Sequence, residues 1–309
     1  METETTLTIE DNRKWLRYSK LTAVNNCPRK AEIQSYIYEE NGGYKTLDTS
    51  FGTAFGAGVA ALLTSNNNLL QGYLAALVGW QEEVVPLHSD AGKNKKSFGD
   101  CLLAIEKYHN EYAPQILQDW EVLILPNGKP AIETFFVIDL PNGFHFGGHI
   151  DLVLKHRTKK LISVRELKTQ GAALHEAKYA KSYQALGYAV ALAHCYPDYT
   201  VEKMYEVYET SERNLVCFYV PQTRLDAVRW LVALLTESRR IGDYIQFGVF
   251  PQNGANCMQW NKICNNYYEC SDSNHEHPDW LPKPVSVEDI DLRFKFDDLA
   301  KTLKVQTIS

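Results

Sequence analysis

Two carboxylates and a lysine stand where two neighbouring apolar segments would bring them together. Asp151 heads one apolar run, and Glu166 and Lys168 end the next one along the chain. In a β-strand, residues two apart point to the same face, so Glu166 and Lys168 should emerge side by side while Leu167 turns into the core. A short hairpin link would place Asp151 next to Glu166. The sequence therefore predicts a pocket of two acids and one ammonium group.

Such a pocket favours metal-dependent chemistry. Two carboxylates held so close repel each other unless a cation lies between them, and hard oxygen ligands favour Mg²⁺ or Mn²⁺. A metal there would acidify a bound water and stabilise charge on a phosphate, while Lys168 would orient the water or neutralise the transition state. The alternative is an acid that ends a strand and a Glu-Lys pair on a solvated face. Because both acids adjoin segments that should be interior, where unpaired charge is costly, we favour the functional interpretation.

The segment after these strands offers three more polar groups. Lys181, Gln184 and Tyr188 fall at positions i, i+3 and i+7, on one face of a predicted helix. That face could turn an ammonium, an amide and a phenol toward the acidic pocket and a phosphate. Taken alone, these residues would indicate an ordinary helix surface, so their interpretation depends on the pocket.

Composition indicates a globular chain that does not span a membrane. The chain has 309 residues, of which 45% are hydrophobic, and a net charge of −6. No apolar run approaches the roughly 18 residues needed to cross a bilayer, and the first residues lack the basic start and apolar middle of a signal peptide. We therefore expect a soluble, intracellular protein. The negative charge argues against a broad polyanion-binding surface but leaves room for a local basic region.

Periodicity predicts helices first and strands later. Residues 28–118 have helical apolar spacing, interrupted by a polar loop. The pattern then changes to strands that we expect to form an antiparallel meander. The predicted elements after this change are strands at 120–125, 131–140, 144–154 and 161–167, a helix at 172–195, strands at 201–210 and 214–220, a helix at 224–246 and a last helix opened by residues 286–289.

Seven cysteines in a chain without an export signal do not suggest a disulfide framework. Three stand singly among apolar neighbours and are predicted to be buried thiols: Cys101, Cys195 and Cys217. The other four are one residue near the start, Cys27, and a cluster near the end, Cys257, Cys264 and Cys270.

Three motifs together resemble the PD-(D/E)XK nuclease superfamily, and in particular its RecB-type exonuclease branch, which includes the CRISPR adaptation nucleases and phage-encoded recombination nucleases. The motifs are G-x-x-D at 148–151, E-x-K at 166–168 and Q-x-x-x-Y at 184–188. The resemblance implies an α/β (α+β) fold of restriction-endonuclease type, with a central mixed sheet flanked by helices, a helical N-terminal region and a C-terminal cysteine-rich element. It assigns Asp151, Glu166 and the Leu167 carbonyl to the metal. It also implies that Lys168, Gln184 and Tyr188 act in catalysis.

The cysteines add to the resemblance. Residues 27–36 are similar to the branch's N-terminal C-P-R-K-x₅-Y element, and residues 250–270 are similar to its three-cysteine tail. In those relatives one early and three late cysteines bind a [4Fe–4S] cluster, which would here be Cys27, Cys257, Cys264 and Cys270. Zn²⁺ is the alternative, but structural zinc sites usually contain a closely spaced C-x₂₋₄-C pair, and the late cysteines are more widely spaced. The cluster would act as a structural staple.

One position departs from the family pattern. Many relatives carry a metal-binding histidine on a helix where this chain has Gly56. His149, two residues before Asp151, is one candidate to compensate. Glu133, in the preceding predicted strand, resembles an acidic position near the site in relatives and is a further candidate metal ligand, or else an ordinary strand-edge acid.

The expected partner is DNA, as single strands or duplex ends, and a recombination partner protein is a further candidate. The basic residues around the predicted site would give phosphates a positive approach. The candidate nucleic-acid contacts are Arg29 and Lys30, beside Cys27, with Lys181 for the backbone and Tyr179 and Tyr183 for stacking on bases.

These observations predict a Mg²⁺- or Mn²⁺-dependent deoxyribonuclease, an exonuclease in phage-type recombination or repair, acting in the cytoplasm, or in the host cytoplasm if phage-encoded. The alternative is a nucleic-acid-binding module that kept the fold and cluster but lost turnover. We expect one nuclease domain over residues 1–271, with a helical part at 28–118, a catalytic core at 119–222 and a helix and cysteine tail at 223–271 that closes on Cys27. Residues 272–309 would form an extension whose role the sequence does not indicate.

Overall fold

The computed structural model describes residues 15–40, 46–80, 96–171, 176, 179, 182–259, 262–271 and 289–304. The chain divides into two compact units, each built from separate stretches of sequence. Unit 1 comprises residues 1–44, 135–148 and 228–309, and unit 2 comprises residues 45–134 and 149–227. Strands β3 and β4 run from one unit into the other. The sequence did not indicate this division, because chain neighbours in β3 and β4 belong to different units.

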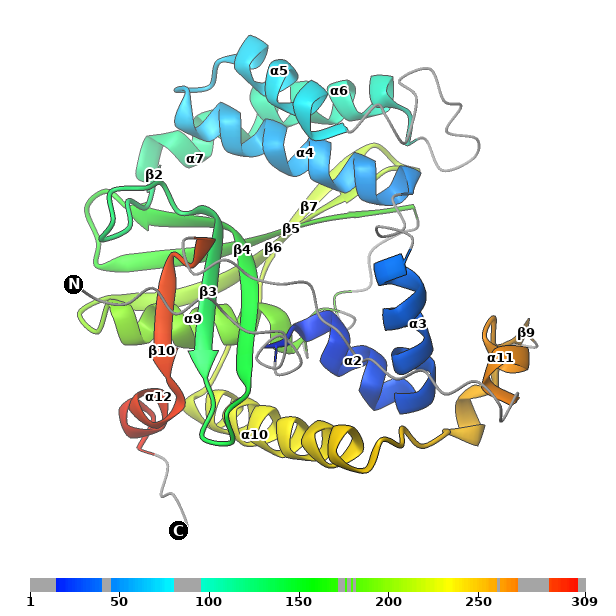
Figure 1. Cartoon of the computed structure of the whole chain (residues 1–309). Coiled ribbons are helices and arrows are strands. Elements are labelled where there is room, and N and C mark those ends of the chain that lie inside the picture. The colour runs from blue at the N-terminus through cyan, green and yellow to red at the C-terminus, as the bar shows by residue number, and fades with distance from the viewer. Residues whose placement is uncertain are drawn as a thin grey trace, which may run out of the picture. The chain divides into compact units, whose positions relative to one another are not determined.

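Unit 2 contains a helical layer and most of the sheet (Figure 1). Its helices are α4 (Leu47–Thr64), α5 (Leu69–Trp80), α6 (Phe98–Lys107), a π-helical turn at Tyr108–Tyr112, α7 (Ala113–Asp119) and α9 (Tyr183–Cys195). Its strands are β2 (Trp120–Val122), the start of β3 (Ile132–Asp139), most of β4 (His145–His156), β5 (Leu161–Gln170), β6 (Thr200–Glu209) and β7 (Asn214–Tyr219).

Helices cover both faces of this part of the sheet. On one face, α4 and α6 share an apolar cluster with strand residues that include Leu152, Leu154 and Leu215. On the other face, Ala185 of α9 packs with Tyr205 and further residues of β6 and β7. The two layers cover both sides of β5 and β6, so charged residues that these strands carry, such as Glu166 and Glu206, are buried beneath them.

Unit 1 holds the start and the end of the chain. Its elements are β1 (Trp15–Leu16), α2 (Tyr18–Asn26), α3 (Pro28–Glu40), the remainder of β3 and β4, nearly all of α10 (Arg224–Phe247), a 3₁₀ turn at Gly254–Asn256, β8 (Met258–Gln259), β9 (Lys262–Ile263), α11 (Tyr267–Ser271), β10 (Leu292–Lys295) and α12 (Phe296–Thr302). Strands β8 and β9 pair with each other in a small separate ladder.

The main sheet is mixed. Its strand order is β10-β3-β4-β5-β6-β7, with β1 and β2 also paired to β4. Strand β5 is antiparallel to β4 and parallel to β6, and β6 is antiparallel to β7. The predicted central mixed sheet with flanking helices is thus confirmed. The predicted antiparallel meander over residues 120–167 was incomplete, because β2 pairs with β4. Beyond it, β5 and β6, joined through α9, run parallel.

Helix α9 begins at Tyr183, with Ser182 as its N-cap. Most of residues 172–181, which the sequence predicted to be helical, lie outside the described residues. The last helix begins at Phe296, not at residues 286–289, of which the first three lie outside the described part. Before it, the strand β10 pairs in parallel with β3, and Arg293 donates two hydrogen bonds to Asp139. Part of the C-terminal extension therefore belongs to the main sheet.

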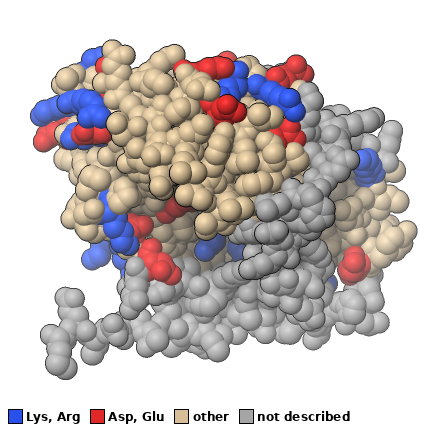
Figure 2. Space-filling view, turned by 90° about the horizontal axis from the view of Figure 1, so that it is seen from above, with Lys and Arg blue, Asp and Glu red and all other residues tan. Residues whose placement is uncertain are grey.

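Helix α5 exposes an apolar surface. Leu70, Leu74, Leu77 and Val78 are exposed along it, and the helix contains no charged residue. Figure 2 shows the face formed by the helical layer as largely uncharged, with Lys, Arg, Asp and Glu gathered toward its edges. The described part of this surface therefore offers few cationic contacts to DNA phosphates.

No helix in the described ranges is long and apolar enough to cross a membrane.

Candidate active site

Strand β5 presents the predicted acid and lysine on the face that α9 covers. Glu166 is 0% exposed, and its Oε1 accepts a hydrogen bond from Lys168 Nζ at 2.5 Å. The Lys168 side chain is 32% exposed, so its ammonium group reaches solvent at the edge of the site. Leu167 points the other way and packs against the cluster under α4. The alternation expected for a strand thus places Glu166 and Lys168 on one face and turns Leu167 to the other.

Asp151 joins these residues at the end of the β4–β5 ladder. Leu152 pairs with Arg165, and the next residues along the two strands are Asp151 and Glu166. There the Asp151 carboxylate, not a backbone carbonyl, accepts the hydrogen bond from Leu167 N at 2.8 Å. The amide and carbonyl of one strand residue point to the same side, so the Leu167 carbonyl is directed toward the β4 side as well. Asp151, Glu166 and this carbonyl therefore lie on neighbouring parts of the two strands.

Burial disfavours the charged form of both carboxylates in this region, and Asp151 adds to the effect on Glu166. Burial and then the charge of Asp151 raise the pKa of Glu166 from 4.5 to about 8, against the opposing effect of Lys168. Burial also raises the pKa of Asp151, although Lys168 and the Leu167 amide oppose it. Nearby Glu166 and Asp151 raise the pKa of Lys168, so this side chain stays protonated at neutral pH. One ammonium group therefore does not offset the cost of ionising both acids in this buried site.

Glu133 of β3 is the third acid of this group. Its backbone is in the left-handed region, at φ 46°, which is strained for a residue with a side chain. Partial burial and the charge of Asp151 raise its pKa to about 7, although the side chain is exposed and water weakens both effects. The effect of the Asp151 charge on this pKa indicates that Glu133 lies near Asp151.

These residues fit a divalent cation held by few protein ligands. Glu166 Oε2 is buried and makes no hydrogen bond with the described residues, so this oxygen is available to a cation. Within the described part, no three His, Cys, Asp or Glu side chains converge closely enough to hold an ion by themselves. Mg²⁺ commonly uses one or two carboxylates and keeps several waters. Two carboxylates with the Leu167 carbonyl meet that requirement without a third acid.

Helix α9 contributes the predicted amide and phenol. Gln184 Nε2 donates to the Tyr188 hydroxyl at 3.0 Å. Tyr188 is buried, and its pKa is raised first by burial and then by the charge of Glu166, which shows that the phenol lies close to that acid. Lys181 lies outside the described residues, before the helix N-cap, and the side chain of Tyr183 lies outside them too.

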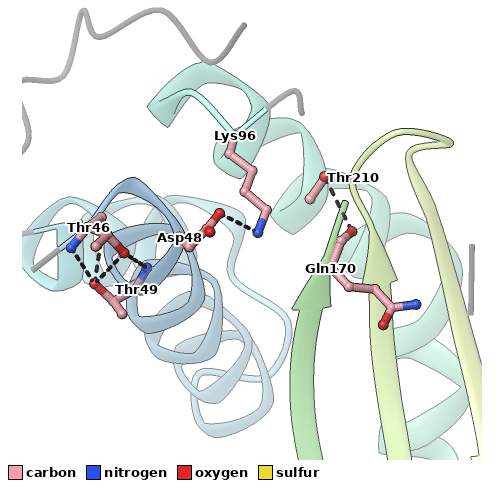
Figure 3. A network of polar contacts seen from close by, with 6 residues as sticks. All are labelled: Thr46, Asp48, Thr49, Lys96, Gln170 and Thr210. Carbon is pink, nitrogen blue, oxygen red and sulfur yellow. Dashed lines mark hydrogen bonds and ion pairs between the residues drawn. The ribbon is translucent and has the colours of Figure 1, made fainter. Parts of the chain in front are cut away.

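Two interactions that the sequence did not reveal hold β5 in place. On the face opposite Glu166, Arg165 Nη1 pairs with buried Glu206 at 3.0 Å, and Glu206 also accepts from Tyr108 OH at 2.9 Å. At the end of the strand, the Gln170 carbonyl accepts hydrogen bonds from the backbone and side chain of Thr210, as Figure 3 shows for the hydroxyl. No local sequence signal distinguishes these pairs, because their members are 40 or more residues apart.

The α4 end near this strand is also fixed by polar contacts. Thr46 and Thr49 form a capping box, and Lys96 pairs with Asp48 at 2.7 Å (Figure 3).

A Cβ built at Gly52 would lie 3.7 Å from the Thr169 hydroxyl, so this face of α4 packs on the end of β5. One turn further along the same face, a Cβ at Gly56 would meet no atom within 4 Å. The position where relatives carry histidine is thus open space, and His149 is exposed on the Asp151 strand.

The four predicted cluster cysteines line one cavity of about 350 Å³ in unit 1. It is also lined by Lys30 and by the amide residues Asn253, Asn256 and Asn266. Burial raises the pKa of Cys270, and the nearby thiols of Cys27, Cys257 and Cys264 raise it further.

Of the single cysteines, Cys101 is buried and Cys195 is half-buried, whereas Cys217 is exposed on the edge strand β7, contrary to the prediction of a buried thiol.

The structure contradicts one of the predicted nucleic-acid contacts and leaves others as predictions. Tyr179 is only 8% exposed, its ring packs against Tyr205 and Phe218, and its hydroxyl donates to Gln170 at 2.9 Å. The prediction that Tyr179 stacks on bases is therefore wrong, because the ring belongs to the core. Arg29 pairs with Glu32 at 2.6 Å. Lys30 is half-buried at the cysteine cavity, and its contact with DNA stays a prediction.

Comparison with known proteins assigns the chain to a family. The sequence profile of the PD-(D/E)XK nuclease superfamily matches residues 16–265. The chain belongs to this superfamily. A crystal structure from Eubacterium rectale, described as "Putative exonuclease", is similar with 13% sequence identity and a TM-score of 0.49, over 94% of this chain and 97% of that one. The search among curated proteins found no match.

Proposed function

We propose that this chain is a Mg²⁺- or Mn²⁺-dependent deoxyribonuclease that removes nucleotides from DNA ends or single strands. The observation that supports it most strongly is the buried Glu166 carboxylate, which shares its region with Asp151 and has one oxygen without a partner among the described residues. A bound divalent cation would offset this negative charge, acidify a water and neutralise charge developing on a phosphate. Membership of the nuclease superfamily makes nucleic acid the expected substrate.

The protein's own residues divide the remaining work. Asp151, Glu166 and the Leu167 carbonyl would hold the cation. Lys168 stays protonated, so it cannot act as a base; it can donate a hydrogen bond to the attacking water or to a phosphate oxygen. Gln184 and Tyr188, held together by their own hydrogen bond, would orient the phosphate from the α9 side. Glu133 would complete the site on the side of Asp151.

Four cysteines around one cavity support the proposal of a [4Fe–4S] cluster in unit 1. A zinc ion needs all four sulfurs about 2.3 Å from one point, whereas a cubane cluster takes one thiolate at each of its four irons, so its thiolates stand further apart. The cysteines line one cavity of about 350 Å³. The late cysteines lack the closely spaced C-x₂₋₄-C pair of most structural zinc sites, which favours the cluster over Zn²⁺.

A catalytically weak nucleic-acid-binding module is the second candidate. Gly56 favours it, because the open space there lacks the imidazole that relatives use. Against it, Asp151, Glu166 and Lys168 keep a geometry that serves no evident structural purpose, since a buried acid with an unused oxygen costs stability.

Digestion of linear and closed circular DNA of one sequence in Mn²⁺ distinguishes these candidates. We expect linear DNA to be degraded while closed circles persist, because an exonuclease needs an end, and we expect Asp151→Asn to degrade neither. Equal cleavage of both forms by the wild type would indicate an endonuclease. Binding of DNA without cleavage of either form would select the binding module.

A further inference from the structure

The cysteine cavity is bounded by segments from opposite ends of the chain, and side-chain amides hold these segments together. Cys27 follows α2, whereas Cys257, Cys264 and Cys270 lie more than 200 residues later. Bringing such distant segments together costs chain entropy. A site of this kind either forms only when the metal group closes it or is held closed by the protein beforehand.

Hydrogen bonds of the late segment converge on the residue before Cys27. The backbone carbonyl of Asn26 accepts from Asn253 Nδ2 at 2.9 Å and also from Asn256 Nδ2. Two residues after Cys27, Arg29 N donates to the Pro251 carbonyl at 3.1 Å. The Cys27 turn is thus bonded to the late segment on both of its sides.

A third amide bonds the late segment to its own last cysteine. Gln252 Nε2 donates to the Cys270 carbonyl at 2.8 Å, and within the segment Cys264 N donates to the Cys257 carbonyl at 2.9 Å. These contacts are among protein groups alone and require no metal.

The cavity itself contains a polar group that its protein surroundings do not satisfy. Asn266 lines it and is 7% exposed, and its Oδ1 makes no hydrogen bond with the described residues. The cavity thus contains one buried acceptor whose partner is not among the described protein groups.

We propose that Asn253 and Asn256 are positioning residues that form a latch on the Asn26 carbonyl, and that this latch holds the four cysteines around the cavity before the cluster binds. The inference rests on the proposed cysteine cofactor. It adds that the site is preformed by the chain's own amides, so that closing it is not left to the metal group. The latch acts by slowing the opening of the cavity and therefore the loss of the cluster.

The test measures cluster loss to a chelator in the full-length, anaerobically purified protein, from the absorbance near 400 nm. The double variant N253D/N256D keeps side-chain shape and the Asn253 cap on Ala255 N but removes both donors. Two exposed-surface hydrogen bonds together correspond to about a tenfold faster loss. The neutral variant N256A, which removes one donor and adds no charge, should lose the cluster about threefold faster.

The matched control is N66D/N68D, which adds the same two charges at exposed positions of unit 2 and should leave the rate unchanged. The cluster-free wild type and variants should have the same far-UV circular dichroism and the same melting temperature, which separates a latch from a general loss of stability.

Equal rates of cluster loss in wild type and N253D/N256D would overturn the latch and leave the cofactor proposal standing. If the wild type were colourless and contained stoichiometric zinc, the cofactor would be Zn²⁺ and not an iron–sulfur cluster. The rates of zinc loss from the wild type and from N253D/N256D would then test the latch, and equal rates would overturn it. Wild type that binds neither metal would overturn both.

Discussion

Lys168→Met should lower the rate of DNA hydrolysis by about 10²- to 10³-fold while leaving Mn²⁺ binding intact. Methionine keeps most of the side chain's length but removes the ammonium group that lies 2.5 Å from Glu166 and reaches solvent at the site. The charge next to the reacting phosphate is lost, whereas the proposed cation ligands remain. Single-turnover hydrolysis at saturating Mn²⁺, with Mn²⁺ affinity measured by calorimetry, separates the two effects.

Lys155→Met is the matched control. Lys155 lies on the neighbouring strand β4 with a similar exposure of 36%, but it pairs with Glu121 outside the proposed site. It should hydrolyse DNA at the wild-type rate. A Lys168→Met protein that is as active as this control would remove Lys168 from the mechanism.

Glu166→Gln should stabilise the metal-free protein at pH 8 and abolish its stabilisation by Mn²⁺. The pKa of Glu166 is raised in the folded state from 4.5 to about 8, so the folded protein binds this proton more tightly than the unfolded chain does. The resulting stability is fully present below about pH 4.5 and is lost as the pH rises to about 8. For a fully buried acid the loss is on the order of 2–4 kcal/mol. Glutamine is neutral at every pH, so the Glu166→Gln variant does not lose this stability as the pH rises.

Thermal melting at pH 5 and pH 8, with EDTA or with Mn²⁺, measures both parts of this prediction. At pH 8 in EDTA, Glu166→Gln should melt about 5 °C or more above the wild type, and the difference should vanish at pH 5. Mn²⁺ at about 100 times its dissociation constant should stabilise the wild type by about 2.7 kcal/mol and leave the variant unchanged.

Glu206→Gln provides the contrast. Glu206 is equally buried but is ion-paired with Arg165 and accepts a hydrogen bond from Tyr108. Its loss should destabilise the protein at both pH values, by about 3–5 kcal/mol, because Arg165 is left buried without its partner. If Glu166→Gln also destabilised the protein at pH 8, the acid would be a structural partner of Lys168 and not a metal ligand.

The parts of the site that the sequence predicted are those that follow from local periodicity. The two-residue period of β5 correctly placed Glu166 beside Lys168 and turned Leu167 away, and the four-residue spacing of Gln184 and Tyr188 brought them together on α9. Such relations depend on neighbouring residues of one element and so can be read from the residues themselves.

The parts that were missed depend on distant segments. Tyr179 resembled an exposed aromatic residue because its local sequence is polar, yet β6 and β7 supply the rings that bury it. The Arg165–Glu206 pair and the parallel pairing of β10 with β3 join residues far apart in the chain. No local pattern in a single sequence encodes such pairings, so tertiary packing alone determined them.

The central claim is that Asp151 and Glu166 hold one divalent cation. Anomalous X-ray diffraction from crystals of the full chain soaked in Mn²⁺ tests it most directly. We predict one strong peak about 2.2 Å from a carboxylate oxygen of each acid and from the Leu167 carbonyl, and no such peak in crystals of Asp151→Asn. A wild-type crystal saturated with Mn²⁺ that shows no peak between these two acids would contradict the account.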